Sequence, residues 1–121
     1  MKAFKPFAVM TLLMMGTAQA GFINPIEFDG SEAQKNEVIE YIKMRVKWNY
    51  CERIDMCQAT TLRMMEKENL AAFKRMTSAK SPEIMDRVIR DYCQQIDMCD
   101  YSTLEMMYNE NERASTETLG W

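Results

Sequence analysis

Apolar residues recur at helical spacing along four segments of the chain, and none of these segments shows the alternation typical of a strand. The first segment follows Ser31, which with Gln34 three positions later forms the capping-box pattern of a helix start. Its predicted buried face contains Ile39, Ile42, Val46 and Tyr50. The second segment opens at Thr60 or Thr61, and its predicted stripe contains Leu62, Met65, Ala72, Phe73 and Met76. The pattern therefore predicts two helices in the first half of the domain.

The second half of the domain repeats this arrangement. Ser81-Pro82 is typical of a helix start, because serine caps the first turn and proline suits the first helical position. The predicted buried face of this third helix contains Ile84, Val88 and Tyr92. A fourth helix is predicted to open at Ser102 or Thr103 and to bury Leu104, Met107 and Ala114. The remaining residues, 115–121, form a polar tail outside the predicted helical domain.

One octet occurs twice in the chain. YCERIDMC, residues 50–57, returns 42 positions later as YCQQIDMC, residues 92–99. Further identities continue at the same offset on both sides without a gap, which indicates a duplicated unit of about 42 residues, at about 31–78 and 81–114. The expected fold is therefore all-α, with four helices arranged as two duplicated, disulfide-stapled helical hairpins in one small bundle. An extended N-terminal arm, residues 21–30, is expected to precede it.

Each octet carries two cysteines, and the chain contains four in total: Cys51, Cys57, Cys93 and Cys99. A straight helix would separate the first two by about 9 Å along its axis, whereas a disulfide needs α-carbons within about 7 Å. Either the chain turns between the cysteines of each octet, or the cysteines pair with the other copy. The equal spacing in both copies favours local pairs, Cys51 with Cys57 and Cys93 with Cys99, over crossed pairs.

The first twenty residues have the pattern of a cleaved signal peptide. Lys2 and Lys5 precede a short apolar run at residues 7–15, and Ala18-Gln19-Ala20 is typical of a cleavage site. Without these lysines, 13 of the 15 basic residues remain against 18 acidic ones, a net charge of −5. This charge argues against binding to nucleic acid or to an anionic membrane surface. We expect a periplasmic or secreted protein with no membrane insertion after cleavage, because the signal is of bacterial type and the even cysteine number suits an oxidising compartment.

The composition argues against an enzyme. The chain has no histidine, which removes the usual general base and the commonest metal ligand, and it has no glycine-rich phosphate loop. The repeated acids Asp55, Asp97, Glu68 and Glu110 are expected to be solvated or to bond within turns. The alternative function is that of a small Cu(I) or ligand carrier, because methionine and cysteine sulfur are typical Cu(I) ligands and stand together at Met56-Cys57 and Met98-Cys99. The methionines within the predicted helices are expected to pack in the core. No cofactor or metal site is predicted.

Two asparagines fall within the apolar stripes of the second and fourth helices. Asn69 and its counterpart Asn111 would be costly to bury without hydrogen bonds. We expect each to make a structural hydrogen bond, either to the other copy or to Tyr50 or Tyr92.

The two copies differ most on the first helix of each. Tyr41, Met44 and Trp48 lie within about 60° of one another, opposite the predicted buried face. Their counterparts are the charged residues Glu83, Asp86 and Arg90. Either the arm at residues 22–28 folds back over this apolar face, or a protein partner binds there.

The predicted function is that of a non-enzymatic, protein-binding module with Tyr41, Met44 and Trp48 as the partner-binding residues. Inhibitor, chaperone-like factor, immunity protein and envelope-assembly factor are the classes that fit.

Overall fold

The computed structural model describes residues 21–121, so the predicted signal peptide, residues 1–20, lies outside the described part of the chain. The described part contains no strand and four α-helices: α1 (Glu32–Lys47), α2 (Ala59–Met76), α3 (Pro82–Ile89) and α4 (Tyr101–Ala114). Short π-helical turns extend α1 and α3, at Trp48–Glu52 (η2) and Arg90–Gln95 (η3). These elements confirm the predicted all-α class, with four helices and a disulfide near the helix ends of each hairpin.

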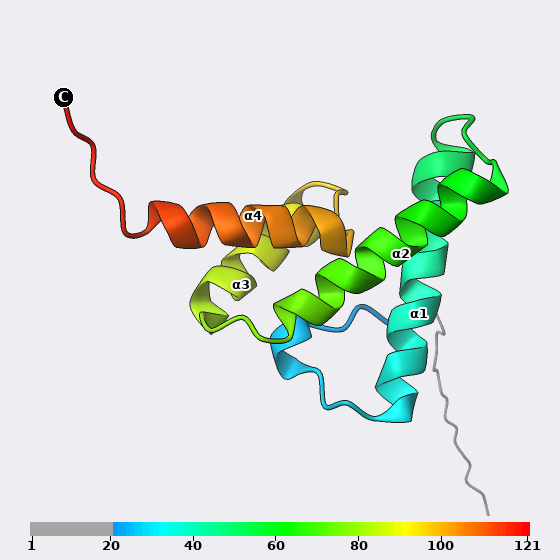
Figure 1. The fold of residues 1–121 in the computed structure, drawn as a ribbon, viewed down its shortest axis with the longest axis horizontal. Helices are drawn as coiled ribbons and strands as arrows, with labels where there is room; N and C mark the ends of the chain where they lie inside the picture. Colours follow the sequence, from blue (N-terminus) through cyan, green and yellow to red (C-terminus); the bar gives the residue numbers. More distant parts are fainter. Residues whose placement is uncertain (1–20) are drawn as a thin grey trace, which may run out of the picture.

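The two hairpins meet through their second helices. Helix α2 packs against both α1 and α4, and α3 packs against α4 (Figure 1). Each hairpin therefore contributes one inner helix, α2 or α4, and one outer helix, α1 or α3. The tail, residues 115–121, leaves the end of α4 and projects away from the helices.

Side-chain caps begin two of the helices at the predicted residues. Ser31 Oγ accepts a hydrogen bond from the backbone N–H of Gln34 at 3.1 Å, and Ser81 Oγ accepts one from Ile84 at 3.2 Å. The Gln34 side chain reaches back to the N–H of Asp29 at 2.9 Å, two residues further than a capping box requires. These contacts define the starts of α1 and α3.

The predicted starts of α2 and α4 were too late. Helix α2 begins at Ala59 after Gln58, and α4 begins at Tyr101 after Asp100, so the predicted caps at Thr60 or Thr61 and at Ser102 or Thr103 lie within the first turn. In α4 the reason is visible, because the hydroxyls of Ser102 and Thr103 donate hydrogen bonds to the Asp100 carboxylate at 3.2 and 2.7 Å. Both hydroxyls are therefore bound to Asp100, the residue before α4, and do not cap the backbone.

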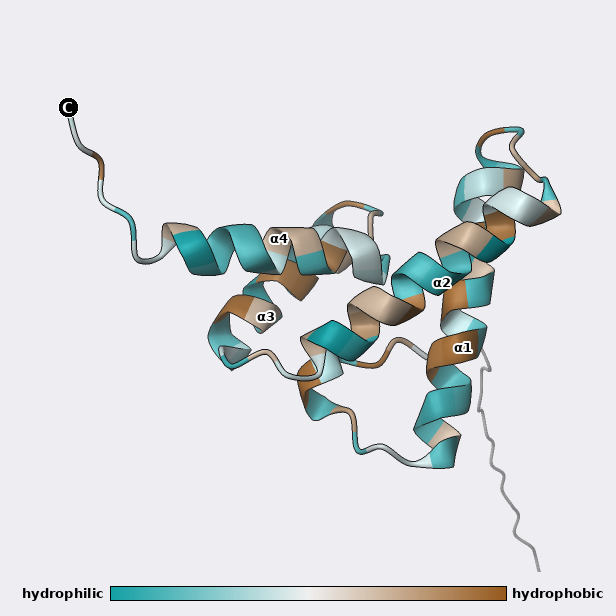
Figure 2. Ribbon diagram, in the orientation of Figure 1, coloured by the Kyte–Doolittle hydropathy of each residue, from teal (hydrophilic) through white to brown (hydrophobic). Residues whose placement is uncertain are grey.

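The core lies between the two hairpins and under the arm. The buried apolar residues are Val38, Tyr41, Ile42, Val46, Ala72, Phe73, Met76, Met85, Val88, Cys99, Tyr101, Leu104 and Tyr108. The predicted stripe of α1 needs correction, since Ile39 is 37% exposed whereas Val38 and Tyr41 are buried. The buried sector is displaced because α1 packs against α2 on one side while the arm and the start of α4 contact Tyr41 on the other. Figure 2 shows hydrophobic and hydrophilic residues alternating along α1 and α3, as expected for helices that bury one face.

The arm, residues 21–30, is fixed to the second copy by aromatic contacts. It contains a short 3-10 turn at Pro25–Glu27, and its Phe22 ring stacks on Tyr101 with centroids 5.3 Å apart. Tyr101 also contacts the rings of Tyr41 at 5.7 Å and Phe73 at 4.8 Å. The Tyr101 hydroxyl donates to the carbonyl of Ile23 at 2.9 Å and accepts from the N–H of the same residue at 3.1 Å. Tyr101 is therefore the point where the arm, α1, α2 and α4 come together.

Burial in this cluster changes the ionisation of two tyrosines. Desolvation raises the pKa of Tyr41 to about 12, partly offset by the positive charge of Arg45. Desolvation also raises the pKa of Tyr101, against the opposing effect of its hydrogen bond with Ile23. An unfolded tyrosine has a pKa of about 10. The folded state therefore holds both protons more tightly, and this contribution to stability is complete below about pH 10 and is lost as the pH rises towards the folded pKa.

We expect the free energy of unfolding to fall between about pH 10 and pH 12, by about 2–3 kcal/mol for Tyr41 alone. Tyr41→Phe should reduce this fall, because phenylalanine has no proton to release. Urea denaturation at stepped pH measures the effect, with Tyr50→Phe, outside the aromatic cluster, as the control. An absorbance titration in which Tyr41 ionises at the ordinary tyrosine pKa would contradict this account.

Candidate functional site

The repeated octet closes each hairpin in the same way. The backbone N–H of Met56 donates to the carbonyl of Tyr50 at 2.8 Å, and the N–H of Met98 donates to the carbonyl of Tyr92 at 3.0 Å. The disulfides lie directly beside these hydrogen bonds, joining Cys51 to Cys57 and Cys93 to Cys99, with α-carbons 4.5 and 4.4 Å apart. The local pairing is confirmed and crossed pairing is excluded. Each octet therefore encodes a turn held by a hydrogen bond and a covalent bridge.

The two bridges lie in different surroundings. Cys99 is buried in the core, and its carbonyl accepts a hydrogen bond from the Tyr41 hydroxyl at 2.6 Å. Cys57, the equivalent residue of the first copy, is exposed. This difference arises because the second octet leads into the start of α4, which the arm and α1 cover, whereas the first octet lies at the free end of its hairpin (Figure 1).

Replacing both cysteines of one bridge with alanine should lower the free energy of unfolding by about 2–2.5 kcal/mol, the loop-closure entropy of so short a loop. The pair Cys93→Ala, Cys99→Ala should cost more than the pair Cys51→Ala, Cys57→Ala, because alanine at position 99 leaves unfilled space in the core. Urea denaturation of the two double variants compares them directly. Equal losses would show that the burial of Cys99 adds nothing to its bridge.

Asn69 lies between the two copies. This buried side chain donates through Nδ2 to the carbonyl of Met65 at 2.9 Å and accepts through Oδ1 from the backbone N–H of Ser102 at 3.0 Å. Ser102 is in the first turn of α4, where backbone N–H groups have no helical partner. Its counterpart Asn111 makes the equivalent bond within its own helix, to the carbonyl of Met107 at 2.8 Å, and is half-buried. Asn69 thus has a structural role at the interface of the hairpins.

Asn69→Ala should destabilise the protein by about 1–3 kcal/mol, because it removes two hydrogen bonds of a buried side chain and leaves the half-buried N–H of Ser102 without its acceptor. Asn111→Ala is the matched control and should cost less, since its bond lies within one helix. Chemical denaturation of both variants tests the difference. A larger loss for Asn111→Ala would contradict the assigned role of Asn69.

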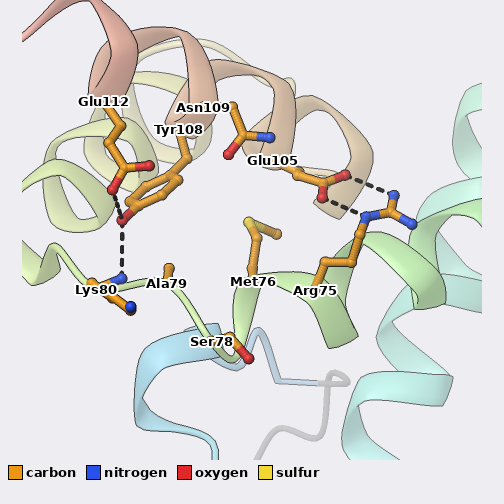
Figure 3. A pocket seen from close by; sticks show the side chains of 9 residues that line it. All are labelled: Arg75, Met76, Ser78, Ala79, Lys80, Glu105, Tyr108, Asn109 and Glu112. Carbon is orange, nitrogen blue, oxygen red and sulfur yellow. Dashed lines mark hydrogen bonds and ion pairs between the residues drawn. The ribbon is translucent and has the colours of Figure 1, made fainter.

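The pocket drawn in Figure 3 lies between the end of α2 and α4, with a volume of about 350 Å³. Its polar groups bind one another. The Tyr108 hydroxyl accepts hydrogen bonds from the backbone N–H groups of Lys80 and Ser81 at 3.1 and 3.0 Å and donates to Glu112 at 3.2 Å. Arg75 forms a two-bond ion pair with Glu105, at 2.6 and 2.8 Å. The residues that line this pocket therefore bind one another and join the two hairpins. Its main polar groups are already paired.

The three residues predicted to bind a partner do not share one exposed surface. Tyr41 is buried, hydrogen-bonded to Cys99, and covered by Phe22 of the arm with ring centroids 5.5 Å apart. Met44 and Trp48 remain 43% and 40% exposed. The arm therefore covers one end of the predicted face and leaves the other end free.

Met44 and Trp48 border a shallow pocket of about 420 Å³ at the end of α1, together with Arg45, Lys47, Glu52 and Asp97. We call these six residues the Met44–Trp48 surface. Arg45 Nη1 lies 2.9 Å from the Asp97 carboxylate, so the second octet contributes to this surface from the other copy. The Arg45 side chain is only 12% exposed, and its Nε and Nη2 atoms are buried without a hydrogen-bond partner among residues 21–121. The surface combines exposed apolar groups with a largely buried arginine that is paired to an exposed carboxylate.

The remaining candidates for chemistry are dispersed. Glu68 lies 3.6 Å from Arg75 and Glu110 pairs with Arg113, while Asp55 is exposed on the first octet. Within residues 21–121 no three His, Cys, Asp or Glu side chains gather where they would hold a metal ion. The cysteine sulfurs of the Cu(I) alternative are engaged in the two disulfides. Met56 and Met98 are exposed on separate octets.

Sequence reasoning missed the contribution of Arg45 and Asp97. Both residues recur in the other copy, as Arg87 and Asp55, so nothing in the sequence distinguishes the pair that meets across the copies. The sequence offered only a weak indication of this ion pair, namely a charged residue in the octet and an arginine beside the apolar face of α1. Their contact depends on how the hairpins pack, which the duplication does not specify.

No family model, curated protein or solved structure matches the chain. Among the helices of residues 21–121, none combines the length and apolar character needed to cross a bilayer.

Proposed function

We propose that this protein is a non-enzymatic binding module of the periplasm or cell exterior that contacts a protein partner through the Met44–Trp48 surface. The observation that carries the proposal is the exposure of Met44 and Trp48 at the end of α1, on a side that neither α2 nor the arm covers. Tryptophan, methionine and arginine are enriched at protein interfaces. The inhibitor, chaperone-like, immunity and envelope-assembly classes all act through such a contact.

The fold itself does not require the two apolar residues. The counterparts of Met44 and Trp48 in the second copy are Asp86 and Arg90, both exposed, and α3 packs without them. The first copy thus carries apolar side chains where the equivalent helix has charges. A partner that covers Met44 and Trp48 would remove from water two large apolar side chains that the packing of the fold does not need.

The surface also carries charge beside its apolar groups. Arg45 is largely buried and forms an ion pair with Asp97, whose carboxylate is 65% exposed. The accessible charge that the pair offers to a partner is therefore the carboxylate of Asp97. Lys47 and Glu52 at the edge would then form the polar rim of the interface.

The two disulfides support a location in the periplasm or outside the cell. Disulfides persist in oxidising environments and are rare in reducing ones. Both bridges here lie beside the backbone hydrogen bond that closes their turn. The predicted signal peptide leads to the same compartment by an independent argument, based on residues 1–20.

Trp48→Ala should weaken partner binding by about 30-fold or more, because truncating a central interface tryptophan removes about 2 kcal/mol or more. The oxidised protein, residues 21–121, is used to capture partners from its own cell envelope, and affinity for each retained protein is then measured by calorimetry. Met64→Ala is the matched control, since Met64 is exposed on α2 away from the surface. Helicity should be unchanged in both variants. Retention of every partner by Trp48→Ala with unchanged affinity would refute the assignment.

A further inference from the structure

A second surface lies on the other side of α1 and is formed with α2. Two adjoining pockets open between these helices, with volumes of about 410 and 170 Å³, and both are lined by Ile39 and Leu70. Three further apolar residues, Phe28, Val38 and Phe73, line the larger pocket, and Ile42 lines the smaller. We call the two pockets together the lysine-rimmed groove. Ile39 and Leu70 lie at its centre, partly exposed.

Lysines border this groove at both ends. Lys35 and Lys74 line the larger pocket, and Lys43 and Lys67 line the smaller one. These are four of the six lysines in residues 21–121, in a chain where acidic residues outnumber basic ones. Lys35 and Lys43 touch Glu32 and Glu40 only through exposed pairs, at 3.2 and 3.4 Å, which contribute little.

The one acidic residue lining the described groove is already paired. Both carboxylate oxygens of Glu66 accept hydrogen bonds from Arg63, each at 2.8 Å. Its negative charge is therefore largely offset by a guanidinium on the same helix, and the groove as a whole presents positive charge around an apolar floor.

The second copy has no equivalent surface in its sequence. The positions that correspond to Ile39, Leu70 and Phe73 are Ser81, Glu112 and Ser115. The four lysines correspond to Thr77, Met85, Asn109 and Thr116. Since the second hairpin folds without this apolar and basic arrangement, the groove is not a requirement of the hairpin.

The positions of the lysines define the shape of the ligand. Each pocket takes one lysine from α1 and one from α2, so the lysines form two pairs across the groove. Along α1 the pairs are eight residues apart, about 12 Å, and along α2 seven residues apart, about 10 Å. A ligand that uses all four lysines therefore has an apolar strip about two helical turns long, with negative charges on both sides. An amphiphile with a single anionic head would use only one pair.

We propose that the lysine-rimmed groove binds an acidic amphipathic helix of a partner protein. A groove between two packed helices accepts a third helix through apolar residues at every third or fourth position, and acidic residues flanking that face meet the two lysine pairs. The groove lies about 140–180° around α1 from Met44 and Trp48, so this site is separate from the Met44–Trp48 surface.

The probe is a synthetic amphipathic peptide of about 18 residues, long enough to form a helix, with leucines on one face and glutamates on both flanks. A matched peptide carries lysine in place of each glutamate, and dodecanoate serves as the single-headed amphiphile. Each probe is titrated into the oxidised protein by calorimetry. The acidic peptide should bind, and the basic peptide should bind at least about tenfold more weakly, because like charges across an interface are costly.

Charge-reversal variants locate the binding site. Lys43→Glu and Lys67→Glu should each weaken the acidic peptide by at least about fivefold, whereas Lys80→Glu, the same charge change outside the groove, should leave its affinity within about twofold. All three lysines are exposed, so the fold should tolerate the changes, which circular dichroism verifies. The variant Trp48→Ala distinguishes this proposal from the proposed function. Peptide titration measures binding at the groove alone, whereas Trp48 belongs to the Met44–Trp48 surface.

Four outcomes of the binding experiments would overturn the proposal. These are absence of acidic-peptide binding, equal binding of the basic peptide, equal effects of Lys67→Glu and Lys80→Glu, and tighter binding of dodecanoate than of the peptide. The last result would instead assign the groove to an anionic amphiphile. A second copy of this chain is the remaining possible occupant, and sedimentation equilibrium tests for it by measuring the oligomeric state. A dimer that Ile39→Glu abolishes would assign the groove to a second copy of this chain.

Discussion

Reversal of the chain direction within each octet is the constraint on which the rest of the structure depends. The cysteines of each bridge are six positions apart, and a backbone hydrogen bond between the preceding tyrosine and methionine closes the same turn. Because the turn is held covalently, the two helices of a hairpin remain neighbours. A domain of this size has limited apolar surface to bury, and its bridges reduce the entropy that folding must overcome.

The two hairpins come from a duplicated unit, but they differ in what they contribute to the packing of the domain. The second copy carries Tyr101 where the first has Ala59, and this tyrosine gathers the arm, α1, α2 and α4 around one ring. The second copy therefore supplies the centre of the core. The first copy retains its freer surface residues, with Met44 and Trp48 on one side of α1 and the lysine-rimmed groove on the other. Both copies contribute to the core, but the two surfaces proposed to bind partners lie on the first copy.

The hairpins and their disulfides could be predicted from the sequence because two independent signals agreed, namely helical periodicity and equal cysteine spacing in both copies. The errors in the buried face of α1 and in the candidate site arose from contacts distant in sequence. The angular position of Tyr41 beside Met44 and Trp48 was assigned from helix geometry, but the covering of Tyr41 depends on Phe22 and Tyr101, which are 79 residues apart. Ile39 and Val38 are adjacent apolar residues, and only the packing of α1 between two neighbours decides which is buried. The groove was missed for the same reason, since its lysines come from two helices.

The contact between the arm and Tyr101 has a consequence for the order in which the molecule is completed. Ile23 bonds to a hydroxyl 78 positions later through both its N–H and its carbonyl. During synthesis the arm emerges before any helix. Phe22 and Phe28 can meet Tyr41 and Phe73 once the first hairpin has been made, but Tyr101 is present only after the start of α4 has been made. The two hydrogen bonds of Ile23 are therefore among the last contacts of the domain to form, although they fix its earliest segment.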